Sequence, residues 1–187
     1  MRSGAQPRLE TARLRLVPAA RTDLAVLQAL WSRPEVRRFL FDNREVSVEL
    51  ARASLDRCLR YTSLGYGLWL VHAKEPSEFL GCVGLVPTST AAHYEPKLTG
   101  LLEVLVGFPN SHWRRGYARE ALGEVLRHAF ETLELARVAA VNDVPNAASE
   151  RMLTALGFKV LSEVRRPKYP MRTYILTRAE RARTGEE

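Results

Sequence analysis

One carboxylate interrupts an apolar run of strand length. Glu103 lies within LLEVLVGF, residues 101–108, and every other member of that run is apolar or glycine. A buried charge costs free energy unless it has a partner or a task. Glu103 therefore faces the solvated side of its strand, pairs with an arginine, or works as a general base that removes a proton from a reacting group.

The same run leads into a short basic turn, WRRGYA at residues 113–118, and then into an apolar pattern of helical spacing. The first N–H groups of a helix have no intrahelical partner, and the helix dipole favours an anion beside them. Gly116 lets the backbone approach a phosphate, and Ala118 keeps the first turn uncrowded. The junction predicts an anion site, with a plain strand-to-helix connection as the alternative.

A sheet and several helices are needed to position these residues. Apolar runs and alternation predict strands over residues 14–18, 67–73, 79–86, 101–108, 136–142, 158–164 and 171–177. Helical spacing predicts helices over residues 24–31, 47–59, 118–133 and 147–156. Asn146 is a strong N-cap residue for the last helix, worth roughly 1 kcal/mol. We expect residues 35–44 to form a packed turn or a substrate wall, and residues 87–100 to form a loop.

Length and composition favour one globular domain, residues 1–187, with residues 1–8 and 178–187 flexible. A chain of 187 residues that is 46% hydrophobic can build one core, whereas two halves would each be marginal. Its two cysteines, Cys58 and Cys82, show no CxxC spacing and fit a reducing cytoplasm. We see no signal segment or bilayer-spanning run, and the scattered histidines predict no metal. We therefore expect a cytoplasmic protein.

The chain is strongly basic, with a formal charge of +7 and a pI near 9.8. Such a charge favours acidic partners, whether a polyphosphate cosubstrate, a nucleic acid or a nucleoprotein. The basic residues gather around residues 37–44, 114–119 and 165–172. They are not interleaved with aromatic residues as in a single-strand platform, so we predict no direct nucleic-acid site.

Four features together resemble the GNAT superfamily of acyl-CoA-dependent N-acetyltransferases. They are Glu103 in its strand, WRRGYA at 113–118, NAAS at 146–149 and LGF at 156–158. The likeness is to the RimJ/RimL type, which modifies protein N-terminal amines, and it extends from LETARLRL at 9–16 to the final strand. The combination is specific although no single motif is. It implies an α/β fold with a mixed, mostly antiparallel central sheet of six or seven strands and helices on both faces.

The resemblance assigns the turn to acetyl-CoA as cosubstrate. The family's loop reads Q/R-x-x-G-x-G/A, and this chain departs from it only at Trp113. The backbone N–H groups that would hold the pyrophosphate belong to Arg114, Arg115, Gly116, Tyr117, Ala118 and Arg119. The strand before them would face the pantetheine and the acetyl carbonyl through Val104, Leu105 and Val106. Asn146 would contact the CoA arm.

The resemblance also assigns the proton chemistry. Glu103 matches the glutamate proposed in the family as the general base. Many relatives use a tyrosine to protonate the leaving thiolate, but Leu153 stands at that position, so Ser149 becomes the candidate acid, directly or through water. The implied reaction is direct acetyl transfer to a primary amine in a ternary complex. Cys82 has no histidine motif beside it, which argues against a covalent relay.

The acceptor amine and the oligomeric state, a homodimer included, stay open. Protein N-termini, ribosomal ones among them, polyamines, antibiotics and amino acids are all used within the superfamily, and the deciding walls lie in residues 35–47 and 87–100. An alternative class is a non-catalytic acyl-CoA-binding or RNA-associated protein. Glu103 and Ser149 argue against a loss of chemistry, whereas the arginine clusters leave an RNA-associated protein open as an alternative.

Overall fold

The computed structural model describes residues 4–88 and 91–184. They form two compact units, one of Met1–Val86 with Leu105–Val125 and one of Pro87–Val104 with Leu126–Glu187. Strand β5 (Leu102–Gly107) begins in the second unit and ends in the first. Of the ends predicted to be flexible, residues 1–3 and 185–187 lie outside the described residues.

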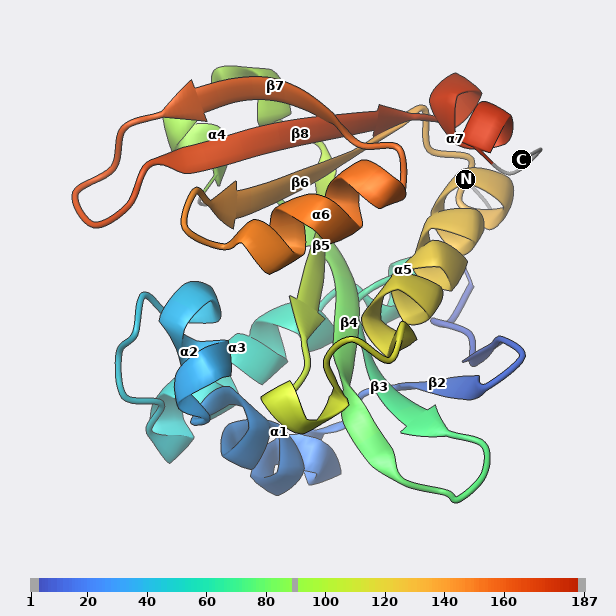
Figure 1. Cartoon of the computed structure of the whole chain (residues 1–187). Helices are drawn as coiled ribbons and strands as arrows, with labels where there is room; N and C mark the ends of the chain where they lie inside the picture. The colour runs from blue at the N-terminus through green and yellow to red at the C-terminus, as the bar shows by residue number, and fades with distance from the viewer. Residues whose placement is uncertain (1–3, 89–90, 185–187) are drawn as a thin grey trace. The chain divides into compact units, whose positions relative to one another are not determined.

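The described strands form an open, mostly antiparallel sheet of eight strands in the order β1-β2-β3-β4-β5-β6-β8-β7 (Figure 1). Besides β5 they are β1 (Leu9–Glu10), β2 (Leu14–Pro18), β3 (Leu68–Ala73), β4 (Phe79–Pro87), β6 (Arg137–Asp143), β7 (Lys159–Val164) and β8 (Met171–Thr177). The predicted α/β class is confirmed. The predicted count of six or seven strands misses β1, whose two residues are too few to show a periodicity.

In the first unit, β1 to β4 pair antiparallel. Three helices pack against them: α1 (Leu24–Trp31), α2 (Pro34–Leu40) and α3 (Val48–Leu59). Their buried side chains, Trp31 and Leu55 among them, share a core with Leu70 of β3. Helix α2 stands in place of the packed turn expected at 35–44, because Pro34 starts a helix without losing a hydrogen bond and Val36 is buried. The other expectation for this segment, a substrate wall, stays a prediction.

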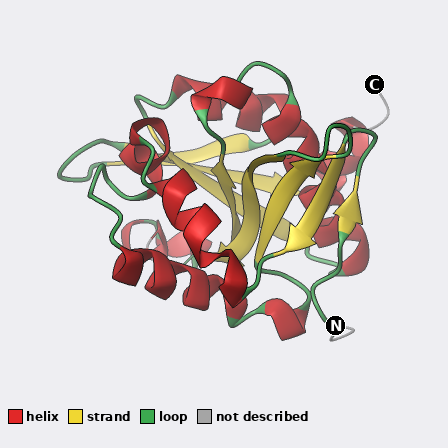
Figure 2. Cartoon of the chain, turned by 90° about the horizontal axis from the view of Figure 1, so that it is seen from below, coloured by secondary structure: helices red, strands yellow, loops and turns green. Residues whose placement is uncertain are grey.

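Helix α5 (Tyr117–Arg127) continues into a π-helical turn at His128–Thr132. Ala121, Leu122 and Val125 are fully buried, as the helical spacing predicts. On the opposite face, Arg119 and Arg127 are exposed, whereas Glu120 and Glu124 are half-buried. The strands and helices are separated by colour in Figure 2.

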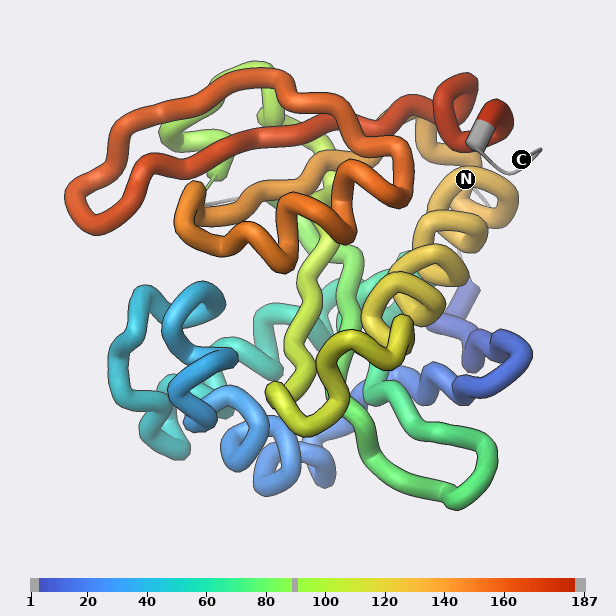
Figure 3. The backbone as a smooth tube through the Cα atoms, viewed as in Figure 1, coloured from blue at the N-terminus to red at the C-terminus, as the bar shows by residue number. Residues whose placement is uncertain are grey.

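In the second unit, β6, β8 and β7 pair antiparallel, and β5 joins β6 in parallel through Glu103 and Ala139. Figure 3 shows β7 and β8 as the predicted hairpin, coloured orange to red. Helix α6 (Ala147–Ala155) follows β6. The expected loop at 87–100 contains α4 (Ala91–Tyr94) and a 3-10 turn (Pro96–Leu98), and the expected polar tail begins with α7 (Arg178–Thr184).

Candidate functional site

Contacts within the turn between β5 and α5 help to fix its backbone. The indole N–H of Trp113 donates to the carbonyl of Phe108 at 2.8 Å. Arg114 and Gly116 then take positive φ angles of 61° and 80°. The hydrogen bond from Glu120 N to Gly116 O, at 3.0 Å, opens the helix. The amides just before Glu120 therefore precede the helical ladder, where a helix accepts external ligands.

The residues of this turn suit a pyrophosphate group. Arg114, Arg115, Gly116 and Arg119 are exposed, so cationic side chains and the positive end of the α5 dipole face solvent. A side chain at Gly116 would be strained at this φ, and its Cβ would lie 3.2 Å from Nη2 of Arg13. Glycine allows the positive φ and leaves the neighbouring amides uncovered.

Strand β5 carries the other residues predicted to face acetyl-CoA. Leu105 packs against the core of the first unit, so alternation along the strand points Val104 and Val106 to the opposite face. The first unit thus contains Leu105, Val106 and the whole turn. Glu103, Val104, Asn146 and Ser149 belong to the second unit.

The carboxylate of Glu103 is the chemically unusual group of the second unit. Its Oε2 atom is buried and has no hydrogen-bond partner among the described residues, so the predicted alternative of an arginine partner finds no support at this oxygen. Burial raises the pKa of Glu103 to about 7, because the charged form loses hydration without compensation. A carboxyl group with such a pKa can accept and release a proton at neutral pH.

Asn146 and Ser149 meet at the start of α6. The side-chain oxygen of Asn146 accepts a hydrogen bond from Ser149 N at 3.2 Å, which confirms the predicted N-cap. The Asn146 carbonyl in turn accepts from the side-chain amide of Asn142 at 3.2 Å. This arrangement fixes the backbone of Ser149 in the first helical turn, where its side chain is half-buried.

Both cysteine thiols are buried and free. Burial raises the pKa of Cys82 to about 12 and that of Cys58 to about 11. Because the thiolate is the nucleophilic form, neither side chain is suited to carry an acyl group at neutral pH. This favours direct transfer over a covalent relay.

Two of the basic residues in the 165–172 cluster are engaged in ion pairs. Arg166 pairs with the buried Asp143 at the end of β6. Arg172 pairs with Glu163 at 2.9 Å and with Glu150 of α6. These contacts tie the β7–β8 hairpin to β6 and α6, so part of this cluster serves the structure of the second unit.

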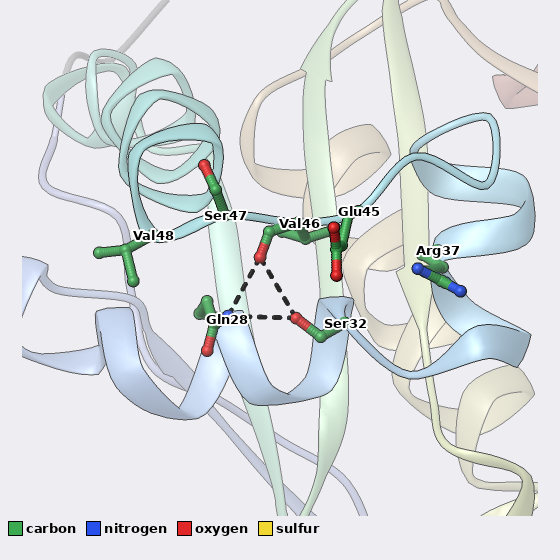
Figure 4. A pocket seen from close by; sticks show the side chains of 7 residues that line it. All are labelled: Gln28, Ser32, Arg37, Glu45, Val46, Ser47 and Val48. Carbon is green, nitrogen blue, oxygen red and sulfur yellow. Dashed lines mark hydrogen bonds between the residues drawn. The ribbon is translucent and has the colours of Figure 1, made fainter.

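A pocket of about 440 Å³ lies among α1, α2 and the start of α3. Figure 4 shows Gln28 and Ser32 of α1 hydrogen-bonded to each other and to the Val46 carbonyl, with Arg37 and Glu45 farther along. The Nε atom of Arg37 is buried without a hydrogen-bond partner among the described residues. The pocket thus lies in the 35–47 segment expected to select the acceptor.

Sequence reasoning missed two residues that contact the turn and the start of α5. Thr11 and Arg13, in the connection between β1 and β2, hydrogen-bond to Glu120 in the first turn of α5. Arg13 also donates to the carbonyl of Arg115. The available signal was the position of both residues inside LETARLRL, which carries the family resemblance without revealing a contact across more than a hundred residues.

Comparison with known proteins decides the family. The sequence matches the acetyltransferase (GNAT) domain over residues 13–159, well over half of the chain. The chain belongs to the GNAT family. This family consists of acyltransferases with acetyl-CoA as cosubstrate, which confirms the predicted class and cosubstrate at the level of the family. Within the described residues, no helix is long and apolar enough to cross a membrane.

Two curated relatives and one solved structure are informative. FsC-acetyl coenzyme A-N(2)-transacetylase of Aspergillus fumigatus is 32% identical over 157 residues, 82% of this chain but only 65% of the relative. The uncharacterized N-acetyltransferase YoaA of Bacillus subtilis is 27% identical over 164 residues, 87% of this chain and 89% of YoaA. The structure of RimL, a ribosomal alpha-N-protein acetyltransferase in complex with coenzyme A, has a TM-score of 0.74 and 14% identity, covering 91% of this chain and 98% of that one. At that identity, the likeness to RimL concerns the fold alone.

The burial of Glu103 predicts a pH-dependent stability. Its pKa rises from an ordinary 4.5 to about 7 on folding, so the unfolded chain releases this proton first and the free energy of unfolding falls as pH rises from about 4.5 to 7. Glu103→Gln removes this loss and should stabilise the protein at pH 8 by up to about 3 kcal/mol, and not at pH 4.5.

Urea denaturation of both proteins across this pH range measures the difference. Glu45→Gln, which changes an exposed carboxylate, should follow the wild type at every pH. Parallel stability curves for the wild type and Glu103→Gln would show that the carboxylate is not buried in solution.

Proposed function

We propose that this GNAT protein transfers the acetyl group of acetyl-CoA directly to a primary amine in a ternary complex. The observation that carries the proposal is the Oε2 atom of Glu103, which is buried without a hydrogen-bond partner among the described residues, together with the raised pKa of this carboxyl, about 7. It stands in the strand that leads into an exposed, basic helix start. A strand residue that served only packing would gain nothing from such a charge.

The residues that would hold the cosubstrate are those that the family resemblance assigns. The backbone N–H groups of residues 114–119 would bind its pyrophosphate, supported by the exposed turn and the positive φ of Gly116. Val104 and Val106 would line the pantetheine arm on one face of β5, whereas Leu105, expected to join them, packs against the core of the first unit. Asn146 would add a polar contact from the start of α6. Acetyl-CoA supplies the activated acetyl group.

The chain's own residues would move the protons. An amine is protonated at neutral pH and must lose a proton before it attacks, and Glu103 would take that proton directly or through one water. The hydroxyl of Ser149 would donate a proton to the leaving thiolate, directly or through water. Positioning of the two substrates and backbone donors aimed at the carbonyl oxygen would supply much of the rate.

The acceptor we favour is a protein N-terminus, as in the RimJ/RimL type. The pocket beside Arg37 supports it, because a peptide can place several groups against mixed polar and charged walls. Arg38 and Arg44 are exposed on the same segment and favour an acidic partner surface. The second candidate is a small-molecule amine, which the name of the fungal relative favours.

Replacement of Gly116 tests the cosubstrate site. Gly116→Val should weaken CoA binding about ten-fold or more, roughly 1.4 kcal/mol, because the branched side chain disfavours the positive φ and covers the amides. Titration calorimetry with CoA measures the effect. Gly4→Val, at a glycine with open space around it, is the control, and an unchanged affinity in Gly116→Val would remove the turn from the site.

Replacement of Glu103 tests the chemistry. Glu103→Gln should keep CoA affinity but lower kcat by roughly 10²-fold at neutral pH, with partial recovery as pH approaches that of the free amine. Ser149→Ala should lower kcat less, because water can replace a hydroxyl donor. Steady-state rates across pH measure both effects, and wild-type turnover by Glu103→Gln at every pH would leave the carboxyl a structural role.

A panel of amines tests the acceptor. Peptides with a free N-terminus and acidic residues behind it should give a higher kcat/KM than spermidine, whose positive charge opposes the arginines. Arg37→Ala should lower kcat/KM for the peptide, whereas Arg52→Ala, an exposed arginine of α3, should not. Much faster acetylation of spermidine than of every peptide would favour the small-molecule candidate.

A further inference from the structure

The connection between β1 and β2 is bonded to the start of α5 by a dense set of contacts. The hydroxyl of Thr11 donates to Oε1 of Glu120 at 2.5 Å, and Arg13 N donates to the same oxygen at 3.1 Å. The guanidinium of Arg13 reaches Oε2 of Glu120 through Nε at 2.7 Å and Nη2 at 2.6 Å. The side chain of Glu120 in α5 is thus held by four donor atoms of two residues, Thr11 and Arg13, from a distant segment of the same unit.

The third nitrogen of the same guanidinium contacts the turn itself. Nη1 of Arg13 donates to the carbonyl oxygen of Arg115 at 3.1 Å. The guanidinium carbon also lies 4.9 Å from the centre of the Tyr117 ring, within the range of a cation–π contact. Arg13 therefore contacts the residues on both sides of Gly116.

The hydrogen bond from Arg13 to the Arg115 carbonyl also restricts the orientation of the Gly116 N–H group. The carbonyl of Arg115 and the N–H of Gly116 belong to one planar trans peptide, in which they point in opposite directions. A carbonyl held toward Arg13 therefore turns the Gly116 N–H away from Arg13. Because glycine populates positive and negative φ about equally, an external contact is needed to select the φ of +80° at Gly116.

The opposite charges of Arg13 and Glu120 also suit the binding of an anion at the start of α5. Burial by itself would raise the pKa of Glu120, but the hydrogen bonds from Thr11 and Arg13 outweigh it and hold the pKa below its ordinary value. An ionised carboxylate stabilises the first turn of a helix, yet it would repel an anionic ligand bound there. The adjacent guanidinium of Arg13 neutralises that charge locally, so Glu120 can stabilise α5 without repelling an anionic ligand.

We propose that Arg13 is a positioning residue for the cosubstrate: it fixes the peptide between Arg115 and Gly116 so that its N–H is presented to the pyrophosphate. This rests on the proposed role of the turn as the pyrophosphate site. Arg13 needs no contact with the cosubstrate. Its guanidinium is required because one planar group reaches the carboxylate and the carbonyl together, which an ammonium group cannot do in the same geometry.

The test compares Arg13→Ala and Arg13→Lys with Arg15→Ala, the next arginine along the chain, whose guanidinium bonds to Ser77. Arg13→Ala should raise the Kd for CoA and the KM for acetyl-CoA about ten-fold, with kcat at saturation within about two-fold of the wild type. Arg13→Lys should not restore the affinity for CoA, and Arg15→Ala should bind CoA as tightly as the wild type.

Circular dichroism and thermal unfolding identify the folded variants. Arg13→Lys keeps the test decisive if Arg13→Ala does not fold.

The outcomes separate this proposal from the one on which it rests. Unchanged CoA affinity in folded Arg13→Ala, or full restoration by Arg13→Lys, overturns the positioning role while Gly116→Val still weakens binding. A fall in kcat with an unchanged KM overturns it as well. Unchanged CoA affinity in Gly116→Val instead removes the pyrophosphate site itself.

Discussion

Close packing between β4 and the end of β5 sets the place where the anion-binding turn begins. A Cβ at Gly81 would lie 2.4 Å from the carbonyl oxygen of Gly107, so no side chain fits there without a backbone shift. A Cβ at Gly107 would approach Sγ of Cys82 at 3.2 Å and Cδ1 of Leu40 at 3.3 Å. The core of α2 and β4 therefore holds the last residue of β5, and the turn starts from a fixed point.

The pKa values of Glu120 and Glu103 differ because their surroundings differ, and the difference suits one carboxylate to a structural role and the other to proton transfer. Glu120 receives hydrogen bonds from Thr11 and Arg13 that outweigh its burial, so its pKa is lowered and it stays charged. The Oε2 atom of Glu103 is buried and receives no such hydrogen bond from the described residues, and the pKa of Glu103 is raised to about 7. A residue that positions others works best with a constant charge, whereas a base must bind a proton near the working pH.

The sequence reveals those features that depend on local periodicity or on single residue preferences. The apolar stripe of α5, the β7–β8 hairpin and the Asn146 cap follow from neighbouring residues, and all are present. Helix α2 was missed because mixed charged and aromatic residues conceal its narrow buried face. The contacts of Arg13 and the missing partner of Glu103 Oε2 depend on residues far apart in the chain, and no local pattern encodes them.

An anion site made of backbone amides must be open to its ligand and yet rigid, and these demands conflict. Exposed ion pairs add little stability because water screens them, so a single surface contact would leave this turn mobile. Here the support comes from several directions: Trp113 closes the turn onto Phe108, and Arg13 joins it to Glu120 and Arg115. The turn can therefore be ordered before a ligand arrives, which lowers the entropy lost on binding.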